Sequence, residues 1–261
     1  MKIVAIANNK GGTAKTTSSV ALAGAMGARG WRVLLLDLDP QANATTWAGD
    51  FNTEDRAFAE VLCGEGSLAD LVRPSNMPGV DVVPGTEYLG AMHKLLAEEF
   101  AAERCLAAAL EPHDWSKYDL CVIDTQPLMG LLTFAAFACA DFVLAPVEAS
   151  PMAVAGLAGM LERVEKIRKA YNEKLEFLGV LACRVNDRTL LSREIVERLN
   201  ADYPGKVFEV GIREGVRVRE AWAWQKPLLE YDPTGNATLD YQTAAVELES
   251  RLGLQKPEVA L

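Results

Sequence analysis

The stretch Lys10-Gly11-Gly12-Thr13-Ala14-Lys15-Thr16-Thr17 directly follows the apolar run Ile3 to Ala7 and decides the fold. A strand that runs into a glycine-rich turn and then opens a helix points several backbone N–H groups and the positive end of the helix at one spot. That arrangement suits the phosphates of a nucleotide. The stretch is unusual because it carries two lysines, Lys10 and Lys15, where a common phosphate-binding loop carries one.

The residues of this loop are expected to bind a nucleoside triphosphate. Lys15 is predicted to reach the β- and γ-phosphates, and the Thr16 hydroxyl to ligate the Mg²⁺ that bridges them. Lys10 lies before the turn and cannot easily do the same from the same side. The alternative is that the two glycines only form a turn between a strand and a helix. We predict nucleotide binding by the whole stretch: Lys10, Gly11, Gly12, Thr13, Ala14, Lys15, Thr16 and Thr17.

The pattern K-G-G-x-x-K-[ST]-[ST] resembles the deviant Walker A motif of the ParA/MinD ATPases. The resemblance implies that Lys10 reaches across a dimer, with nucleotide sandwiched between the subunits, to the partner's ATP. Lys10 and Lys15 are therefore both expected to act in catalysis. The chain departs from the family pattern at Ala14, where relatives usually have glycine, which reduces the freedom of the backbone there. We expect the helix to begin at Ala14, where alanine is acceptable.

A second motif follows the apolar run Val33 to Leu36, which breaks into Asp37-Leu38-Asp39-Pro40-Gln41 as a buried parallel strand does at its carboxyl end. This segment resembles the D-x-D-P-Q motif of the same family, in which the second aspartate orients the attacking water. By that resemblance Asp39 is the expected catalytic residue and also belongs to the predicted metal site. Asp37 is expected to organise the site and the phosphate loop. The alternative is an aspartate that caps a turn at the end of a strand.

A third motif is the run Leu120 to Ile123, which ends in Asp124-Thr125-Gln126-Pro127 and is typical of a Walker B strand. Asp124 is predicted to hold the Mg²⁺ through water, so that Thr16, Asp39 and Asp124 form the expected metal site. Relatives usually have proline at the position of Gln126. In relatives that loop senses the γ-phosphate. Gln126 is therefore expected to affect how the protein switches with its nucleotide rather than whether it binds the nucleotide.

Strand-like and helix-like segments alternate along the chain with the spacing of βαβ crossovers. At 261 residues, half of them apolar, the chain is predicted to form one domain over residues 1–261. The predicted fold class is α/β, a doubly wound and mostly parallel sheet flanked by helices, of the P-loop NTPase type. Strands are expected at about residues 2–8, 32–37, 80–84, 118–124, 141–147, 176–183 and 206–212, and helices at about 16–29, 87–110, 153–171, 189–201 and 237–252.

Several other classes of protein are disfavoured by the sequence. The apolar stretch from Leu128 to Ala140 is shorter than the roughly 20 residues that span a membrane, and is expected to be a buried helix. The N-terminal apolar run leads straight into the phosphate loop and is not expected to be a signal peptide. His93 and His113 lack metal-ligand spacing, so no metal other than Mg²⁺ is expected. The five cysteines lack C-x-x-C spacing and are expected to be small core residues in a reducing cytoplasm: Cys63, Cys105, Cys121, Cys139 and Cys183.

Three segments of the last third resemble the Soj-like branch of the ParA proteins. They are Arg188 to Glu194, Val216 to Ala221 and Lys226 to Pro233, which are similar to R-T-x-L-S-R-E, V-R-L-x-E-A and G-K-P-x-x-x-Y-D-P. With the nucleotide motifs, the resemblance covers residues 2 to 252. MinD relatives instead end in a basic amphipathic membrane helix, whereas Gln255 to Leu261 carries neither a basic cluster nor a long apolar face, so no membrane partner is expected.

The resemblance implies an ATPase that uses ATP and Mg²⁺, forms a homodimer and binds DNA non-specifically in the ATP state. It also implies slow hydrolysis stimulated by a ParB-like partner, a cytoplasmic and nucleoid-associated location, and a part in plasmid or chromosome partition. One alternative is a ParA-like ATPase that positions a protein cargo. Another is a metabolic enzyme of the same fold, such as a synthetase that phosphorylates a carboxylate.

The charge distribution bears on DNA binding. The chain has a net charge of −10, which argues against general affinity for polyanions, but residues 184–219 carry a net charge of +2. The alternative for these arginines is a solvated helix face with ion pairs such as Glu194 with Arg198. The DNA-binding residues are expected to be Arg188, Arg193, Arg217 and Arg219.

Four residues of this region depart from the family pattern. Glu214 stands where relatives place an arginine, and Arg213 stands at the position of a proline. Trp222 and Trp224 replace the usual small residues. They are expected to pack in the core, with a partner surface as the alternative.

Overall fold

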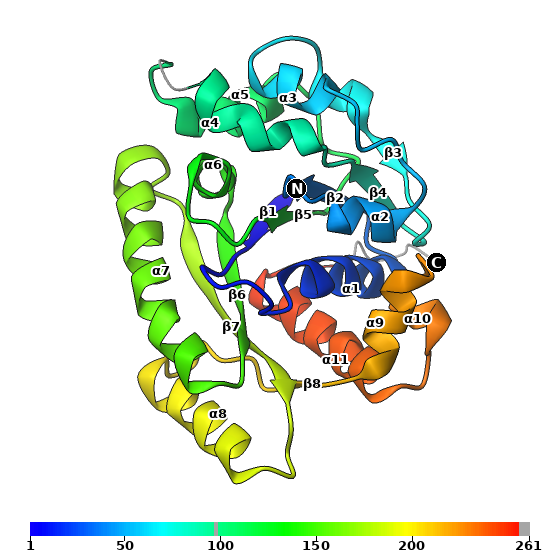
Figure 1. The fold of residues 1–261 in the computed structure, drawn as a ribbon, viewed down its shortest axis with the longest axis vertical. Coiled ribbons are helices and arrows are strands. Elements are labelled where there is room, and N and C mark those ends of the chain that lie inside the picture. The colour runs from blue at the N-terminus through cyan, green and yellow to red at the C-terminus, as the bar shows by residue number, and fades with distance from the viewer. Residues whose placement is uncertain (97–98, 256–261) are drawn as a thin grey trace.

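A computed structural model describes residues 1–96 and 99–255 of the chain. Within these residues the chain forms an eight-stranded sheet in the order β3-β4-β2-β5-β1-β6-β7-β8, with helices on both faces (Figure 1). Neighbouring strands are parallel except β3, which pairs antiparallel with β4. The strands are β1 (Lys2–Ile6), β2 (Val33–Leu38), β3 (Arg73–Pro74), β4 (Val80–Val83), β5 (Leu120–Thr125), β6 (Phe142–Glu148), β7 (Glu176–Val185) and β8 (Ile212–Arg213). The predicted fold class is confirmed.

The helices divide into two layers, one on each face of the sheet (Figure 1). One layer holds α1 (Lys15–Ala28), α2 (Asn43–Ala48), α9 (Val216–Ala223), α10 (Leu228–Tyr231) and α11 (Asn236–Arg251). The other holds α3 (Ala57–Leu62), α4 (Met92–Leu95), α5 (Cys105–Leu110), α6 (Leu131–Cys139), α7 (Pro151–Tyr171) and α8 (Leu190–Asp202). The helix expected over residues 237–252 corresponds to α11, and the buried helix expected between Leu128 and Ala140 corresponds to α6.

Each central strand supplies side chains to both cores, because successive residues of a strand point to opposite faces. In β2, Leu34 and Leu36 belong to the core under α5 and α6, whereas Val33 and Leu35 belong to the core under α1 and α11. All of these side chains are fully buried. This explains why the central strands are continuous apolar runs rather than alternating ones.

The carboxyl ends of the central strands bring the three motifs together. β5 lies between β1 and β2, and Asp124 is in register with Ile6 on one side and with Asp37 on the other. The loop that follows β1, the acidic segment that ends β2 and the Asp124 segment of β5 therefore meet at one edge of the sheet. This is the edge at which open α/β sheets bind ligands.

Two expected elements differ from the structure. The strand expected over 206–212 is reduced to an isolated bridge at Val207 and the two-residue β8. Between them the Glu209 N–H donates a hydrogen bond to the carboxylate of Glu247 on α11 and not to β7. The helix expected over 87–110 is broken into short pieces. Ala101 between them has a left-handed backbone with φ +57°, and neither glycine nor proline stands there to mark the break.

Other expectations concern cysteines, membranes and the tail. Cys121 and Cys183 are buried as expected, but Cys63 is exposed, because it ends the short helix α3 at the surface. No helix in the described part of the chain is long and apolar enough to cross a membrane. The expectation about Gln255 to Leu261 concerns a tail that lies, from residue 256 on, outside the described residues.

Candidate active site

The phosphate-binding loop turns through two left-handed residues before α1 begins. Gly12 has φ +77°, which glycine adopts at no steric cost, and Ala14 has φ +66°. The first helical residue is Lys15, so the expectation that the helix begins at Ala14 is wrong. Alanine in the left-handed region costs roughly 1 to 2 kcal/mol, because its Cβ crowds the backbone. The chain therefore carries backbone strain at Ala14.

The two lysines of the loop lie in opposite environments. Lys15 is only 6 % exposed, and its ammonium donates a hydrogen bond to the Lys10 carbonyl over 3.1 Å. Burial lowers the pKa of Lys15, and the carboxylates of Asp124 and Asp39 oppose that shift. The Lys10 side chain is 37 % exposed, and its ammonium lies 3.5 Å from Glu148 at the end of β6. Only Lys15 points into its own site.

The residues around Asp124 fit a divalent cation. The Ser19 hydroxyl donates to Asp124 Oδ1 over 2.8 Å, while the buried Oδ2 has no hydrogen-bond partner. Burial and the nearby carboxylate of Asp37 raise the pKa of Asp124, and the hydrogen bond from Ser19 opposes the shift. A buried carboxylate oxygen without a partner is costly unless a cation or a proton satisfies it. Thr16 and Asp124 are oxygen donors of the kind that Mg²⁺ prefers, and they would hold it here.

Asp39 and Asp37 are both buried but have different environments. Asp39 Oδ1 accepts the N–H of Gln41 over 3.0 Å, which leaves its other oxygen available at the edge of the sheet. Asp37 is fully used by hydrogen bonds from the Asp39 N–H, the Thr45 N–H and the Thr45 hydroxyl. Burial raises the pKa of Asp37 to about 6, and these hydrogen bonds oppose the shift.

Asp37 therefore organises the Asp39 loop and the start of α2. The described contacts of its carboxylate do not include the phosphate loop, so that part of the expectation is corrected. The reason lies in the topology, since Asp37 is on β2 and β5 separates β2 from the loop after β1. The Thr45 hydroxyl extends this network by accepting the Gly85 N–H over 2.7 Å, which ties the loop after β4 to the site.

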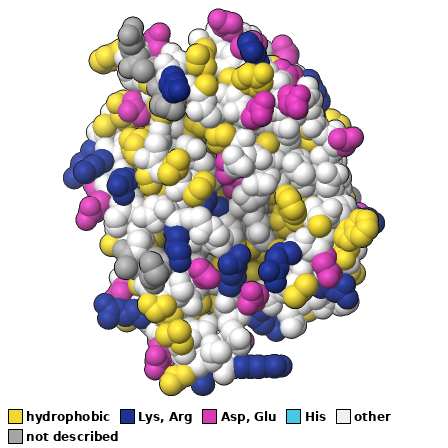
Figure 2. Space-filling view, viewed as in Figure 1, with side chains coloured by type: hydrophobic (Ala, Val, Ile, Leu, Met, Phe, Trp, Pro, Cys, Tyr) yellow, Lys and Arg dark blue, Asp and Glu magenta, His cyan; other side chains and the backbone are white. Residues whose placement is uncertain are grey.

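The expected DNA-binding arginines lie in three segments, which are the turn after β7, α8 and α9. Arg188 is in the turn after β7 and Arg193 is on α8, and both are exposed. Arg217 on α9 is exposed but paired with Glu220 at 2.8 Å. Arg219, also on α9, lines two hollows beside the phosphate loop, together with Thr17. Lys and Arg side chains gather over the lower part of this face, around α8, β8 and α9 (Figure 2).

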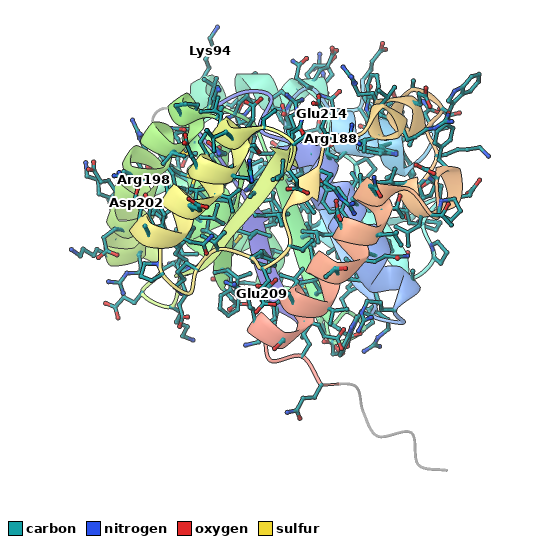
Figure 3. All side chains as sticks on the ribbon, turned by 90° about the horizontal axis from the view of Figure 1, so that it is seen from below. Lys94, Arg188, Arg198, Asp202, Glu209 and Glu214 are labelled. Carbon is teal, nitrogen blue, oxygen red and sulfur yellow. The ribbon has the colours of Figure 1, made fainter. Side chains whose placement is uncertain are left out.

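Several basic residues of the same region are neutralised locally. Arg198 pairs with Asp202 at 2.6 Å, not with Glu194 as the alternative supposed (Figure 3). Arg213 is clamped by Asp240 through both carboxylate oxygens, the shorter contact being 2.6 Å. Among the residues that the structure describes, Arg188, Arg193 and Arg219 have no ion-pair partner, and these are the three cations best placed for phosphate contacts.

The two unusual tryptophans are at the surface. Trp222 on α9 is 42 % exposed and lines the hollow that contains Thr16 and Thr17, and Trp224 is 69 % exposed. The expectation that they pack in the core is wrong, because α9 turns only Ala221 fully inward. The alternative of a partner surface stays open.

Two residues of the site were missed by sequence reasoning. Ser19 lies four residues after Lys15 on the same face of α1, a spacing that could have pointed to it. Glu148 follows no motif, and only the neighbouring positions of β1 and β6 bring it to the loop.

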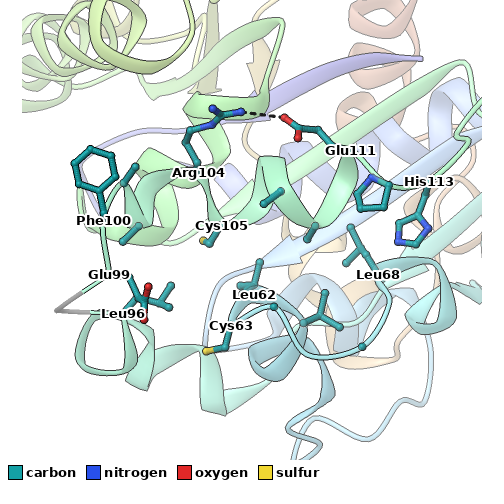
Figure 4. A pocket seen from close by; sticks show the side chains of 18 residues that line it. Leu62, Cys63, Leu68, Leu96, Glu99, Phe100, Arg104, Cys105, Glu111 and His113 are labelled. Atoms are coloured by element: carbon teal, nitrogen blue, oxygen red, sulfur yellow. Dashed lines mark hydrogen bonds and ion pairs between the residues drawn. The ribbon is translucent and has the colours of Figure 1, made fainter.

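A larger hollow lies away from the motifs. It has a volume of about 670 Å³ and is formed by α3, α5 and the segment before α5 (Figure 4). Cys63, Cys105, Phe100 and His113 are among its lining residues. None of the three nucleotide motifs contributes to it. A substrate bound in this hollow would therefore not lie beside the phosphate-binding loop and could not accept a phosphate there.

Comparison with known proteins identifies the family. The family described as an AAA domain matches residues 1–177. The chromosome-partitioning ATPase Soj of Thermus thermophilus is 36 % identical over 250 residues, which cover 95 % of this chain and 96 % of that protein. The chromosome partitioning protein ParA of Caulobacter vibrioides is 34 % identical over 253 residues, 96 % of this chain and 95 % of that protein. The chain belongs to the ParA/MinD superfamily of ATPases.

Solved structures agree on the fold, and one of them holds a nucleotide and magnesium. Cobyrinic acid a,c-diamide synthase of Mycobacterium smegmatis, with bound ADP and magnesium, is 25 % identical with a TM-score of 0.80, and 98 % of each chain is covered. Apo McdA of Cyanothece is 25 % identical with a TM-score of 0.81, covering 94 % of this chain and 99 % of that one. ATP and Mg²⁺ are accordingly the cofactors of a ParA-like ATPase such as this one.

The strain at Ala14 makes a prediction about stability. Ala14→Gly is expected to raise the free energy of unfolding by up to about 1 kcal/mol, because relief of the left-handed alanine exceeds the entropy that glycine adds to the unfolded chain. Urea unfolding without nucleotide measures the change. Ala28→Gly, at the helical end of α1, is the matched control and should lower stability by up to about 1 kcal/mol. Equal destabilisation by both substitutions would contradict the strain at Ala14.

Proposed function

We propose that the chain acts as one ParA-type ATPase domain that forms a homodimer around two ATP molecules, binds DNA without sequence preference in that state and drives plasmid or chromosome partition. Hydrolysis to ADP and phosphate resets the protein. This hydrolysis is slow until a ParB-like partner stimulates it. The Soj and ParA names of relatives that match nearly the whole chain support the proposal.

One observation carries the proposal, and it is the contrast between the two lysines of the loop. Lys15 is buried and directed into its own site, whereas the Lys10 ammonium is partly exposed at the edge of the sheet and directed away from that site. A second positive charge that does not serve its own site is available to the site of a partner. A dimer in which each Lys10 contacts the partner's triphosphate uses it.

The catalytic residues act by position and charge. Lys15 and the N–H groups at the start of α1 neutralise the phosphate oxygens, and Lys10 of the partner subunit adds charge from the other side. Asp39 lies at the same edge with one oxygen not fixed by the Gln41 N–H, and it orients the attacking water. Thr16 and Asp124, with Asp39 as a third candidate ligand, would hold Mg²⁺, which would neutralise the charge that develops on the phosphates.

Exposed apolar side chains support a protein contact at the same edge. Leu128 follows β5, Leu190 and Leu191 begin α8 after β7, and Val216 begins α9 after β8. Each is more than half exposed, although each follows the carboxyl end of a strand beside the site. Apolar side chains gathered beside a binding site are typical of an interface.

DNA binding rests on cations that the chain does not neutralise itself. Contacts to phosphates release counterions, and a dimer presents each of them twice, so that binding depends on the ATP-bound dimer. DNA binding would associate the protein with the nucleoid in the ATP state. Arg188, Arg193 and Arg219 supply free charge, and Arg217 adds charge if Glu220 releases it.

The second candidate is a ParA-like ATPase that positions a protein cargo. It is favoured by Glu214, which places a negative charge between Arg213 and Arg217, and by the exposure of Trp222 and Trp224. Exposed tryptophans are common anchors of protein interfaces. ATP-dependent binding to unrelated duplexes separates the two functions, since a protein that lacks it at low salt fits the cargo function.

The role of Asp39 predicts a trapped state. Asp39→Ala should retain ATP binding and accumulate a long-lived dimer, because it removes the group that positions water but leaves Lys15, Thr16 and Asp124 in place. Sedimentation with ATP and Mg²⁺ measures the dimer, and phosphate release measures hydrolysis. A variant that stays monomeric yet hydrolyses ATP at the parent rate would contradict the role of Asp39.

The free arginines predict a change in salt dependence. Replacing both Arg188 and Arg193 with alanine should weaken binding to any duplex sequence. The plot of log K against log salt, which has a negative slope, should become shallower by about 2 to 4 for the dimer. Fluorescence anisotropy at several salt concentrations measures this with ATP present. Arg198→Ala is the control on the same helix, because Asp202 already neutralises that charge. An unchanged slope in the double variant would contradict the assignment to DNA.

A further inference from the structure

Glu148 joins two cations that come from different parts of the sequence. It is the last residue of β6, which lies between β1 and β7 in the sheet. Its Oε2 lies 3.5 Å from the Lys10 ammonium in the loop after β1, and its Oε1 lies 3.6 Å from the Arg184 guanidinium near the end of β7. Each carboxylate oxygen therefore faces one cation.

The backbone of Lys10 is held independently of its side chain. The Lys10 N–H donates to Asn8 Oδ1 over 3.2 Å, and the Asn8 amide in turn donates to the Pro146 carbonyl on β6 over 2.7 Å. The Lys10 carbonyl accepts hydrogen bonds from Thr13 and Lys15. In the described part of the chain, Glu148 is the acidic group paired with the Lys10 ammonium. The side chain can therefore change its partner while the loop stays in place.

We propose that Glu148 is a positioning residue that holds Lys10 in its own protomer and releases it when the dimer forms. The inference rests on the proposed function, in which Lys10 contacts the partner's ATP. An ammonium that lies against Glu148 of its own subunit cannot at the same time contact a phosphate across an interface. Dimerisation thus includes the loss of two Lys10–Glu148 contacts, one in each subunit.

Arg184 still pairs with the Glu148 carboxylate after Lys10 has left it. When Lys10 departs, Glu148 retains the contact with Arg184, so its charge stays compensated in a site where Glu148 is 28 % exposed. Arg184 has a left-handed backbone with φ +53°, a conformation that is unfavourable for a residue other than glycine, so the surrounding structure holds it there. Arg184 also lines the hollow beside Ala14 and Thr17, next to the phosphate loop.

The size of the effect follows from the exposure of the pair. A partly exposed ion pair typically changes an equilibrium by up to about fivefold. Because two pairs are lost when one dimer forms, removal of the carboxylate charge is expected to strengthen dimerisation by up to about twenty-five-fold.

The first experiment tests the contact itself, without dimerisation. Trace acetylation of the nucleotide-free protein by acetic anhydride, followed by mass spectrometry, gives the reactivity of each lysine. Glu148→Gln is expected to raise the reactivity of Lys10 by about two- to fivefold, because the amine is no longer held beside a carboxylate and is free to approach the reagent. Glu111→Gln, which breaks the exposed pair with Arg104, is the control and should leave Lys10 unchanged. Equal reactivity of Lys10 in the parent and in Glu148→Gln would overturn the inference.

The second experiment tests the consequence. Sedimentation with ATP and Mg²⁺ should show that Glu148→Gln dimerises at a lower protein concentration than the parent, and that the same substitution has no such effect in a Lys10→Ala background. A gain that persists without Lys10 overturns the inference, because Glu148 would then act by another route. If Lys10 becomes more reactive in Glu148→Gln but the parent forms no ATP-dependent dimer, the proposed function fails while the contact between the two residues stands.

Discussion

The site depends on one buried arrangement of charge, the Lys15 ammonium held among carboxylates at the carboxyl ends of β1, β2 and β5. Asp37, Asp39 and Asp124 are all buried there, and Lys15 is the buried cation beside them. Three carboxylates against one ammonium leave an excess of negative charge. A divalent cation would balance that excess. Its complex with a triphosphate would also supply an anion for the N–H groups of the loop and for Lys15.

The strand register fixes this arrangement and also explains what the sequence could predict. Each of the three motifs follows an apolar run, so their meeting at one edge was predictable from the rule that parallel strands bind ligands at their carboxyl ends. The register of Asp124 with Ile6 and Asp37 confirms that these segments are neighbours. The long helices were also predictable, because each is encoded by one continuous helix-like stretch of sequence. These helices are α1, α7, α8 and α11.

Other features depend on contacts between distant residues, which no local pattern records. The backbone of Ala14 is left-handed although alanine favours a helix, because the loop must turn before α1 can begin. Trp222 and Trp224 are apolar yet exposed, since their depth is set by how α9 packs against α10. Glu148 reaches Lys10 across 138 positions of sequence. The short helices α2, α3 and α9 were missed because one or two turns give too little periodicity to detect.

The central claim is that Lys10 serves the ATP of a partner subunit, and a mixture of two inactive variants tests it most directly. A Lys10→Ala subunit keeps Asp39, and an Asp39→Ala subunit keeps Lys10, so a mixed dimer has one complete site only if Lys10 acts across the interface. Phosphate release under stimulated conditions should be near zero for each variant alone and should reappear, at up to about a quarter of the parent rate, in an equal mixture with random pairing. A mixture as inactive as its parts, beside an active parent, would contradict the account.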